Sequence, residues 1–204
     1  DAQNPWPGLA PYDESARDFF HGRAREAEAL ERLLRLAPLV VLYGRSGLGK
    51  SSLLQAGLFP RLRAADMLPV YVRIDFAHGG AADAIEQIAR RLEQEIAVLG
   101  LEAPVRESGE SLWRWLHRKD FEIWTADNRL LAPVLVLDQF EEVFSRSGGT
   151  PERVGAVFDA LADLAENRIT EEVAADRHHG EKLDTLRQRY RMLLSFREDF
   201  LPEL

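Results

Sequence analysis

A glycine-rich segment carries a lysine and a serine at the spacing that phosphate binding requires. Residues 44–51 fit the pattern G-x-x-x-x-G-K-[ST], in which glycines let successive backbone N–H groups point at a phosphate. Lys50 could reach the β- and γ-phosphates, and the Ser51 hydroxyl could ligate Mg²⁺. The predicted phosphate-binding loop and the first residues of the helix after it are Gly44, Arg45, Ser46, Gly47, Leu48, Gly49, Lys50, Ser51 and Ser52.

The segments on either side of this loop favour phosphate binding over a chance match. Residues 39–43 are a short apolar run, typical of a strand that is buried on both faces. Residues 51–62 have the pattern of a helix. The mechanism needs this order, because the N-terminus of the helix adds a partial positive charge beside the phosphate.

An acidic cluster follows another apolar run. Asp138 comes directly after residues 134–137, an apolar run that predicts another buried strand. Many strands end in aspartate as a turn or helix cap, but beside a phosphate loop such a carboxylate is expected to hold Mg²⁺, often through water. We therefore predict a magnesium site formed by Ser51 and Asp138.

Nucleotide hydrolysis would also need a group that orients or deprotonates the attacking water. Gln139 could orient water but cannot accept its proton, and the carboxylates that follow it are Glu141 and Glu142. Both glutamates are candidate bases, with a slight preference for Glu141. The alternative is that they begin a solvated helix, where carboxylates interact favourably with the helix dipole.

Arg197 follows a fourth apolar run, residues 192–196, and so falls at the carboxyl end of a predicted strand. Ligands of open α/β sheets bind at that edge, where a guanidinium could contact a γ-phosphate. An ion pair with the adjacent Glu198 or Asp199 is an equally good explanation of this position.

Composition narrows the class of protein. The chain has 204 residues, 26 Lys and Arg against 34 Asp and Glu, a net charge of −8, and no cysteine. The acidic balance disfavours a mainly electrostatic nucleic-acid binder, and the lack of cysteine excludes disulfides, zinc ribbons and thiol nucleophiles. The longest apolar runs, residues 36–43 and 130–137, are too short to span a membrane. With no apolar leader sequence, we expect a cytoplasmic protein.

The pattern of elements predicts an α/β fold with a mainly parallel sheet, because strands and helices alternate along the chain. Residues 1–22 form a proline-containing segment whose short helix we expect to pack on the core, which comprises residues 23–204. Residues 166–191 are polar, and we expect an inserted loop with a short helix there. The expected strands are residues 39–43, 70–75, 134–137 and 192–196, and the expected helices are residues 13–20, 23–37, 51–62, 85–96, 111–117 and 154–165. Trp113 and Trp115 are more consistent with a core than with a ligand surface.

In combination, these segments resemble the STAND NTPases, signal-transduction P-loop ATPases, and in particular their bacterial novel STAND branch. The resemblance covers nearly the whole chain apart from residues 77–131 and the polar insert. The matching segments are residues 4–9, 19–23, 44–58, 138–142 and 195–200.

The resemblance implies a three-layer P-loop sandwich of the inserted-strand branch, with ATP and Mg²⁺ as cofactors. It also implies that Gly22 and Arg23 lie near the adenine, that Asp138 holds Mg²⁺, and that Arg197 occupies a sensor position. Such a core normally continues into a further strand, a lid and a winged helix, so we expect the sheet to be incomplete at its C-terminal end. Effector and sensor domains would lie outside this chain.

In this family, Mg-ATP binding promotes self-association and activates an effector, and several members act in antiphage defence or programmed cell death. We therefore expect a slowly hydrolysing, ATP-binding switch module. The alternatives are a nucleotide-dependent scaffold without turnover and a DNA-acting ATPase of the initiator type. A GTPase is disfavoured because none of the three lysines falls in an N/T-K-x-D context.

Overall fold

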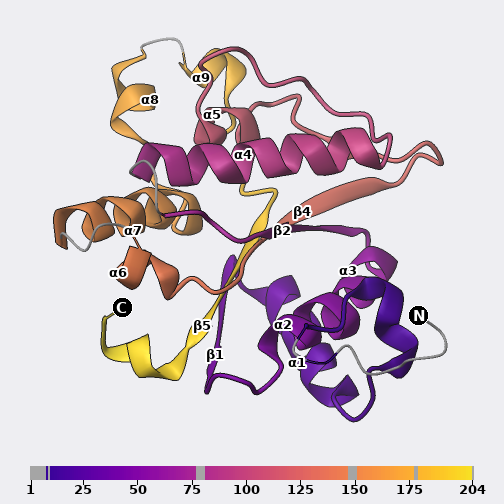
Figure 1. Cartoon of the computed structure of the whole chain (residues 1–204). Coiled ribbons are helices and arrows are strands. Elements are labelled where there is room, and N and C mark those ends of the chain that lie inside the picture. The colour runs from indigo at the N-terminus through magenta and orange to yellow at the C-terminus, as the bar shows by residue number, and fades with distance from the viewer. Residues whose placement is uncertain (1–7, 9, 77–80, 147–150, 177–178, 204) are drawn as a thin grey trace.

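The chain folds as a parallel α/β sheet that is covered by helices on both faces (Figure 1). This computed structural model describes residues 8, 10–76, 81–146, 151–176 and 179–203. The strand order is β1-β5-β4-β2, with β3 paired to β4. Because β5 lies between β1 and β4, the strand that precedes Asp138 is not adjacent to the strand that precedes the glycine-rich loop.

Four strands of the sheet run parallel, and the fifth is short and antiparallel. The sheet is mostly parallel because β1 pairs with β5, β5 with β4, and β4 with β2, all in the same direction. The short strand pairs with the first two residues of β4. The strands are β1 (Leu39–Gly44), β2 (Met67–Val72), β3 (Ile123–Trp124), β4 (Leu130–Leu137) and β5 (Arg191–Arg197).

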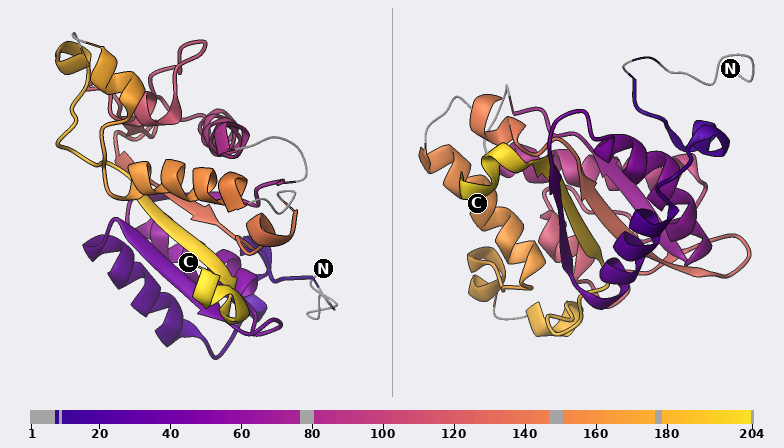
Figure 2. Two further views of the ribbon diagram at one scale, coloured as in Figure 1. Left: turned by 90° about the vertical axis from the view of Figure 1, so that its left-hand side faces the viewer. Right: turned by 90° about the horizontal axis from the view of Figure 1, so that it is seen from below.

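Alternation along the central strands divides the core into two parts. Val134 and Val136 of β4 face one hydrophobic cluster, whereas Leu135 and Leu137 face the other. The first cluster is completed by α1 (Ala24–Leu36), the π-helical turn η2 (Leu53–Leu58) and α3 (Phe59–Ala64), and the second by α4 (Ala81–Val98), α5 (Leu112–Leu116) and α7 (Pro151–Ala165). The left view of Figure 2 shows the sheet between these two groups of helices, so the molecule has three layers.

Strand β2 occupies residues 67–72, so the prediction of residues 70–75 is wrong by three positions. The error comes from Pro69, which lies inside the strand. A proline has no N–H to donate, but β2 is at the edge of the sheet and pairs only with β4, which is where a strand tolerates proline. Strand β4 also begins earlier than predicted, because β3 pairs with Leu130 and Leu131.

The polar insert contains two short helices instead of the one that was predicted. These are α8 (Glu171–Ala175) and α9 (His179–Lys182). The insert is tied to the end of α5 by backbone hydrogen bonds, among them Lys119 N–H to the carbonyl of Lys182 at 2.9 Å and Asp184 N–H to the carbonyl of His117 at 2.8 Å. Trp113 and Trp115 of α5 are buried, which confirms their assignment to the core.

The N-terminal segment packs a short 3-10 helix, η1 (Glu14–Phe19), against the π-helical turn. Asp13 caps this helix by accepting a 3.1 Å hydrogen bond from Ala16 N–H. Gly57 allows the ring of Phe20 to approach, because a Cβ at Gly57 would lie only 3.1 Å from that ring. Residues 4–9, a segment that carried the family resemblance, fall outside the described residues except for Gly8.

Two short helices complete the described chain near the carboxyl ends of β4 and β5. Helix α6 (Glu142–Arg146) follows the acidic segment after β4, and the 3-10 helix η3 (Glu198–Glu203) follows β5. Phe144 of α6 stacks on Phe200 of η3, with ring centroids 5.5 Å apart. The acidic segment and Arg197 are therefore held beside each other.

Candidate functional site

The glycine-rich loop joins the end of β1 to a helical segment that begins with α2 (Lys50–Ser52). Gly47 and Gly49 have φ angles of 79° and 72°, in the left-handed region that favours glycine. Gly49 is the N-cap residue of α2, and the helical segment continues through η2 and α3 without a break. The sequence therefore needs glycine at these two positions to turn from strand to helix.

The ammonium group of Lys50 lies over the loop from which it starts. Its Nζ donates hydrogen bonds to the carbonyls of Gly44 at 2.8 Å and Arg45 at 3.1 Å. The outer side of the loop is braced by Arg23, whose Nη1 donates to the carbonyl of Leu48 at 2.7 Å. Arg45 forms an exposed 3.0 Å ion pair with Glu198.

Asp138 is only 2% exposed and accepts hydrogen bonds from three hydroxyl groups. Ser51 Oγ and Tyr71 Oη donate to Oδ2 at 2.6 and 2.8 Å, and Ser195 Oγ donates to Oδ1 at 2.7 Å. The backbone N–H of Asp138 donates to the carbonyl of Val72 at 3.0 Å. The carboxylate is thus fixed by neighbours on β2 and β5 and at the start of α2.

Tyr71 remains a hydrogen-bond donor over the whole physiological pH range. Burial and the adjacent Asp138 carboxylate raise the pKa of its phenol above the ordinary value. The hydroxyl therefore stays neutral and donates a hydrogen bond to the Asp138 carboxylate. It does not become a second anion beside that carboxylate.

The two candidate bases lie in different surroundings. Gln139 has a φ of 56°, which turns the chain sharply after Asp138. Glu141 then lines a cavity, and its Oε2 is buried without a hydrogen-bond partner among the described residues. Glu142 begins α6 and forms an ion pair with Arg73 instead. The two glutamates are adjacent in the sequence but therefore lie in different environments.

Arg197 combines both of its predicted environments. Its Nη2 pairs with Asp199, and its guanidinium carbon lies 5.9 Å from the centroid of the Phe200 ring. It also lines the same cavity as Glu141, and its Nε is buried without a hydrogen-bond partner among the described residues. The ion pair therefore leaves part of the guanidinium available.

This cavity has a volume of about 640 Å³ and lies at the carboxyl ends of β1, β4 and β5. It brings together nine of the predicted site residues, which are Ser46, Gly47, Gly49, Lys50, Ser51, Ser52, Asp138, Glu141 and Arg197. Gln139 also lines it. The predicted residues that do not line it are Gly22, Arg23, Gly44, Arg45, Leu48 and Glu142.

Another part of the lining comes from the N-terminal segment and was not predicted. Ala10, Pro11 and Tyr12 border the cavity together with Gly8, and the N–H of Tyr12 donates to Ser52 Oγ at 3.0 Å. The only signal in the sequence was the proximity of Pro11 and Tyr12 to a segment of the family resemblance. No spacing rule connects residue 12 to residue 52.

The residues of the cavity suit a phosphorylated ligand with a divalent cation. Backbone N–H groups at a helix start and a lysine ammonium provide positive charge. The Ser51 hydroxyl and the Asp138 carboxylate are oxygen donors of the kind that Mg²⁺ prefers. Glu141 and Arg197 also line the cavity and add one carboxylate and one guanidinium.

Comparison with known families agrees with this geometry. Residues 5–204 match the sequence model of the family described as Novel STAND NTPase 1. The chain belongs to this family. The resemblance to the novel STAND branch is therefore confirmed over nearly the whole sequence, including residues 77–131, which had carried no resemblance.

As a novel STAND NTPase, the chain belongs to a group of proteins whose name denotes nucleotide hydrolysis. A search of curated proteins found no match to the sequence. Among the described residues, none of the helices combines the length and the apolar character needed to cross a membrane.

Proposed function

We propose that this chain is the ATP-binding module of a STAND switch protein and that it hydrolyses ATP slowly. The observation that carries the proposal is the 2.6 Å hydrogen bond from Ser51 Oγ to Asp138 Oδ2. It joins the last residue of the phosphate-loop pattern to the carboxylate at the end of β4, which is the pairing expected of two magnesium-binding groups.

The residues of the cavity divide the work of binding between them. The backbone N–H groups of residues 46–51 and the ammonium group of Lys50 would bind the phosphates, while Ser51 and Asp138 would hold Mg²⁺. When bound, Mg²⁺ would neutralise charge on the phosphate oxygens. Tyr71 and Ser195 keep the Asp138 carboxylate oriented toward Ser51.

The carboxylate of Glu141 is the best-placed base for hydrolysis. Its side chain lines the cavity, and its Oε2 has no hydrogen-bond partner among the described residues, so its carboxylate could accept a proton from the attacking water. Gln139 could orient that water. Glu142 is engaged with Arg73 and is the weaker candidate.

The wider role is inferred from the family. We propose that ATP binding promotes self-association of a longer protein and activates an effector domain outside this chain, in antiphage defence or programmed cell death. Arg197, which lines the cavity beside Glu141, would report whether the γ-phosphate is present. Gly22 and Arg23 do not line the cavity, but they remain candidates for the adenine end because of the family resemblance.

The pairing of surface arginines weakens the DNA-binding alternative. Arg61 and Arg63 form ion pairs with Glu31 and Glu14 at 2.9 Å. Arg114 pairs with Asp176, and Arg118 with Asp120. Each of these four arginines has a carboxylate partner, so their charges are neutralised locally and do not form a basic patch.

Titration of a fluorescent ATP analogue into the Lys50→Ala variant tests the proposal. Because the ammonium group would contact the phosphates directly, we expect binding to fall at least about a hundredfold, equivalent to ~2.7 kcal/mol. Lys119→Ala is the matched control, since its ammonium group donates to the carbonyl of Glu181 in the polar insert, away from the cavity. Unchanged binding by a folded Lys50→Ala variant would refute the site.

A further inference from the structure

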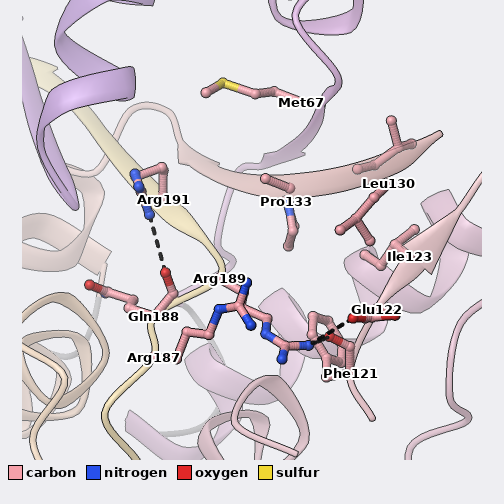
Figure 3. Close-up of a pocket in the computed structure, with 12 residues that line it drawn as sticks. Met67, Phe121, Glu122, Ile123, Leu130, Pro133, Arg187, Gln188, Arg189 and Arg191 are labelled. Atoms are coloured by element: carbon pink, nitrogen blue, oxygen red, sulfur yellow. Dashed lines mark hydrogen bonds and ion pairs between the residues drawn. The ribbon is translucent and has the colours of Figure 1, made fainter. Parts of the chain in front are cut away.

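A second cavity lies at the opposite end of β4 and β5 from the candidate nucleotide site. Its volume is about 280 Å³, and it is lined by the first residues of β2, β4 and β5, by β3, and by residues 187–189 (Figure 3). It shares no lining residue with the cavity around Asp138. Any ligand that it binds would therefore be distinct from the nucleotide.

The cavity arises where β4 changes partners. On β4, Leu130 and Leu131 pair with β3, and the pairing with β5 begins only at Val134. Neither β3 nor β5 therefore pairs with Ala132 or Pro133, and Pro133 has no N–H to offer. The floor of the cavity is therefore set by strand register, and residues 187–189, which lead into β5, complete its lining.

Three arginines stand at alternate positions along one wall. Arg187, Arg189 and Arg191 belong to an extended stretch that leads into β5, so their side chains project to the same side. Figure 3 shows Arg187 and Arg189 close together on the side of the cavity away from Met67, with Arg191 apart from them beside Gln188. The cavity therefore has a cationic side and an apolar side.

Arg189 already has partners. Its Nη1 donates to the carbonyl of Phe121 at 2.7 Å and lies 3.5 Å from Oε1 of Glu122. Glu122 is the single carboxylate among the residues that line this cavity. The lining therefore keeps an excess of positive charge after this ion pair is counted.

The other two guanidinium groups lack a counter-charge within the part of the chain that the structure describes. Among the described residues, Arg187 forms no ion pair, and Arg191 donates only to backbone carbonyls, at 2.8 Å to Tyr190, 3.2 Å to Leu34 and 3.3 Å to Gln188. Most described arginines pair with a carboxylate. Arg187 is exposed and Arg191 is half-buried, and two cations on one wall without a carboxylate partner favour an anionic ligand.

The opposite side of the cavity is suited to an apolar group. Met67, Leu130 and Leu131 contribute aliphatic surface there, and Leu130 is 45% exposed. The neighbouring Leu186 is 94% exposed. An occupant that combined carboxylates with a large apolar side chain would match both walls.

We propose that this cavity is the docking site for an acidic peptide segment of a partner protein. One large apolar side chain of the peptide enters the cavity, and carboxylates on either side pair with Arg187 and Arg191. The spacing supports a peptide, because Arg187 and Arg191 are four residues apart, which is about 13 Å in an extended chain, as are carboxylates two residues before and two residues after the apolar residue of an extended ligand. The net charge of −8 does not oppose this, since charges beyond about 8 Å are largely screened at physiological ionic strength.

A nucleic acid fits the same wall less well. Phe121, the aromatic residue of the lining, is buried and offers no exposed face on which a base could stack. The aliphatic side of the cavity would remain uncovered by a phosphate backbone. A single-stranded oligonucleotide is therefore included below as a competing ligand.

Peptide selection on the whole chain tests the proposal. A phage-displayed library of random ten-residue peptides is selected on the 204-residue protein, and the consensus peptide is synthesised with a fluorescent label. We expect acidic residues on both sides of Leu, Phe or Trp in the consensus. Failure to enrich any clone, or a consensus without acidic residues, would overturn the proposal.

Binding of the consensus peptide is then compared among variants by fluorescence anisotropy. Arg187→Glu should weaken binding about tenfold or more, as reversal of one charge-assisted contact predicts. Arg32→Glu is the matched control, because Arg32 is also an exposed arginine without an ion pair among the described residues, but it lies on α1. The Arg187→Glu variant should still bind the fluorescent ATP analogue as the unaltered chain does, which shows that it is folded.

Two results of this comparison would count against a peptide site at this cavity. Equal loss of peptide binding in Arg187→Glu and Arg32→Glu would show a general charge effect. Tighter binding of a single-stranded oligonucleotide than of the peptide, abolished by Arg187→Glu, would assign the wall to nucleic acid instead. Retention of peptide binding in Lys50→Ala would further separate this site from the proposed nucleotide site.

Discussion

Ser51 Oγ donates a 2.6 Å hydrogen bond to Oδ2 of Asp138, although the two residues are 87 positions apart in the sequence. The bond spans the gap between the start of α2 and the end of β4. It places a hydroxyl and a carboxylate where one cation could contact both. Strand β5 lies between β1 and β4 in the sheet. The contact therefore joins the segments that follow two strands which are not neighbours.

The first prediction concerns the magnesium dependence of ATP binding. Ser51→Ala and Asp138→Asn should each weaken binding of the ATP analogue about tenfold in Mg²⁺, equivalent to ~1.4 kcal/mol, because each removes a proposed metal contact. With EDTA present, binding should change much less. Titrations with and without Mg²⁺ measure the difference.

Ser195→Ala is the control for this comparison. Ser195 also donates to Asp138, at 2.7 Å to Oδ1, but it does not line the cavity. It should therefore have a smaller effect on binding in Mg²⁺ than Ser51→Ala. If Ser51→Ala and Asp138→Asn weakened binding equally with Mg²⁺ and with EDTA, their role would be to shape the loop and not to hold the metal.

The second prediction separates the two glutamates. Glu141→Gln should reduce single-turnover ATP hydrolysis about a hundredfold or more, within the range of general-base catalysis, while ATP binding is retained. Glu142→Gln should lower the rate less than about tenfold, because Glu142 is paired with Arg73 outside the cavity lining. A larger loss of rate in Glu142→Gln would reverse the assignment, and no hydrolysis by the unaltered chain would favour the scaffold alternative.

The glycine-rich loop and its partner carboxylate were predictable because each depends on a local requirement. Positive φ angles at Gly47 and Gly49 need residues without a Cβ, and this need is visible in the sequence. Asp138 follows an uninterrupted apolar run, and the carboxyl ends of parallel strands meet at one edge of a sheet. This arrangement of parallel strands is enough to place Asp138 near the glycine-rich loop.

The remaining partners of Asp138 could not be predicted, because they depend on which strands are neighbours. Tyr71 comes from β2 and Ser195 from β5, and neither residue is unusual in its own segment. The predicted position of β2 was wrong because Pro69 is a strand breaker in most contexts, and its tolerance here depends on an edge position. The difference between Glu141 and Glu142 likewise depends on Gln139, a non-glycine residue with positive φ.

The third prediction addresses Arg197 as a sensor of the terminal phosphate. Arg197→Met should weaken ATP binding about tenfold and ADP binding much less, because Arg197 lines the cavity and its guanidinium is proposed to contact the γ-phosphate. Asp199→Asn serves as the control, since it removes the ion pair and keeps the guanidinium. If both nucleotides lost affinity equally in Arg197→Met, the arginine would be a structural residue of the ion pair and not a sensor.

The fourth prediction is that the free energy of unfolding depends on pH through His117, which contacts the polar insert. His117 is 1% exposed and stacks on Trp113 with ring centroids 3.8 Å apart. Its Nδ1 lies 2.7 Å from the carbonyl of Trp113, and its Nε2 lies 2.5 Å from the side chain of Asn167 at the start of the insert. Burial lowers the pKa of the His117 imidazole below its ordinary value, against the smaller effect of these hydrogen bonds.

The sign of the pH effect follows from that lowered pKa. Below pH ~6.5, the ordinary histidine pKa, the unfolded chain binds a proton that the folded chain resists, so the free energy of unfolding should fall as pH decreases. The fall should level off once the pH passes the folded-state pKa. Carboxylates with lowered pKa, such as Glu86 and Asp120, lose their stabilising effect only near or below pH ~4.5. Urea unfolding between pH 7.5 and 5.5 therefore isolates the imidazole.

Replacement of His117 tests whether this side chain causes the slope. His117→Gln should be less stable than the unaltered chain at pH 7.5, because it loses the stacking on Trp113, but its stability should change less between pH 7.5 and 5.5. His21→Gln should keep the full slope, since His21 is exposed. If His117→Gln kept the same pH dependence of stability, the proton taken up on unfolding would bind another group. The buried imidazole of His117 would then not be the cause of the pH dependence.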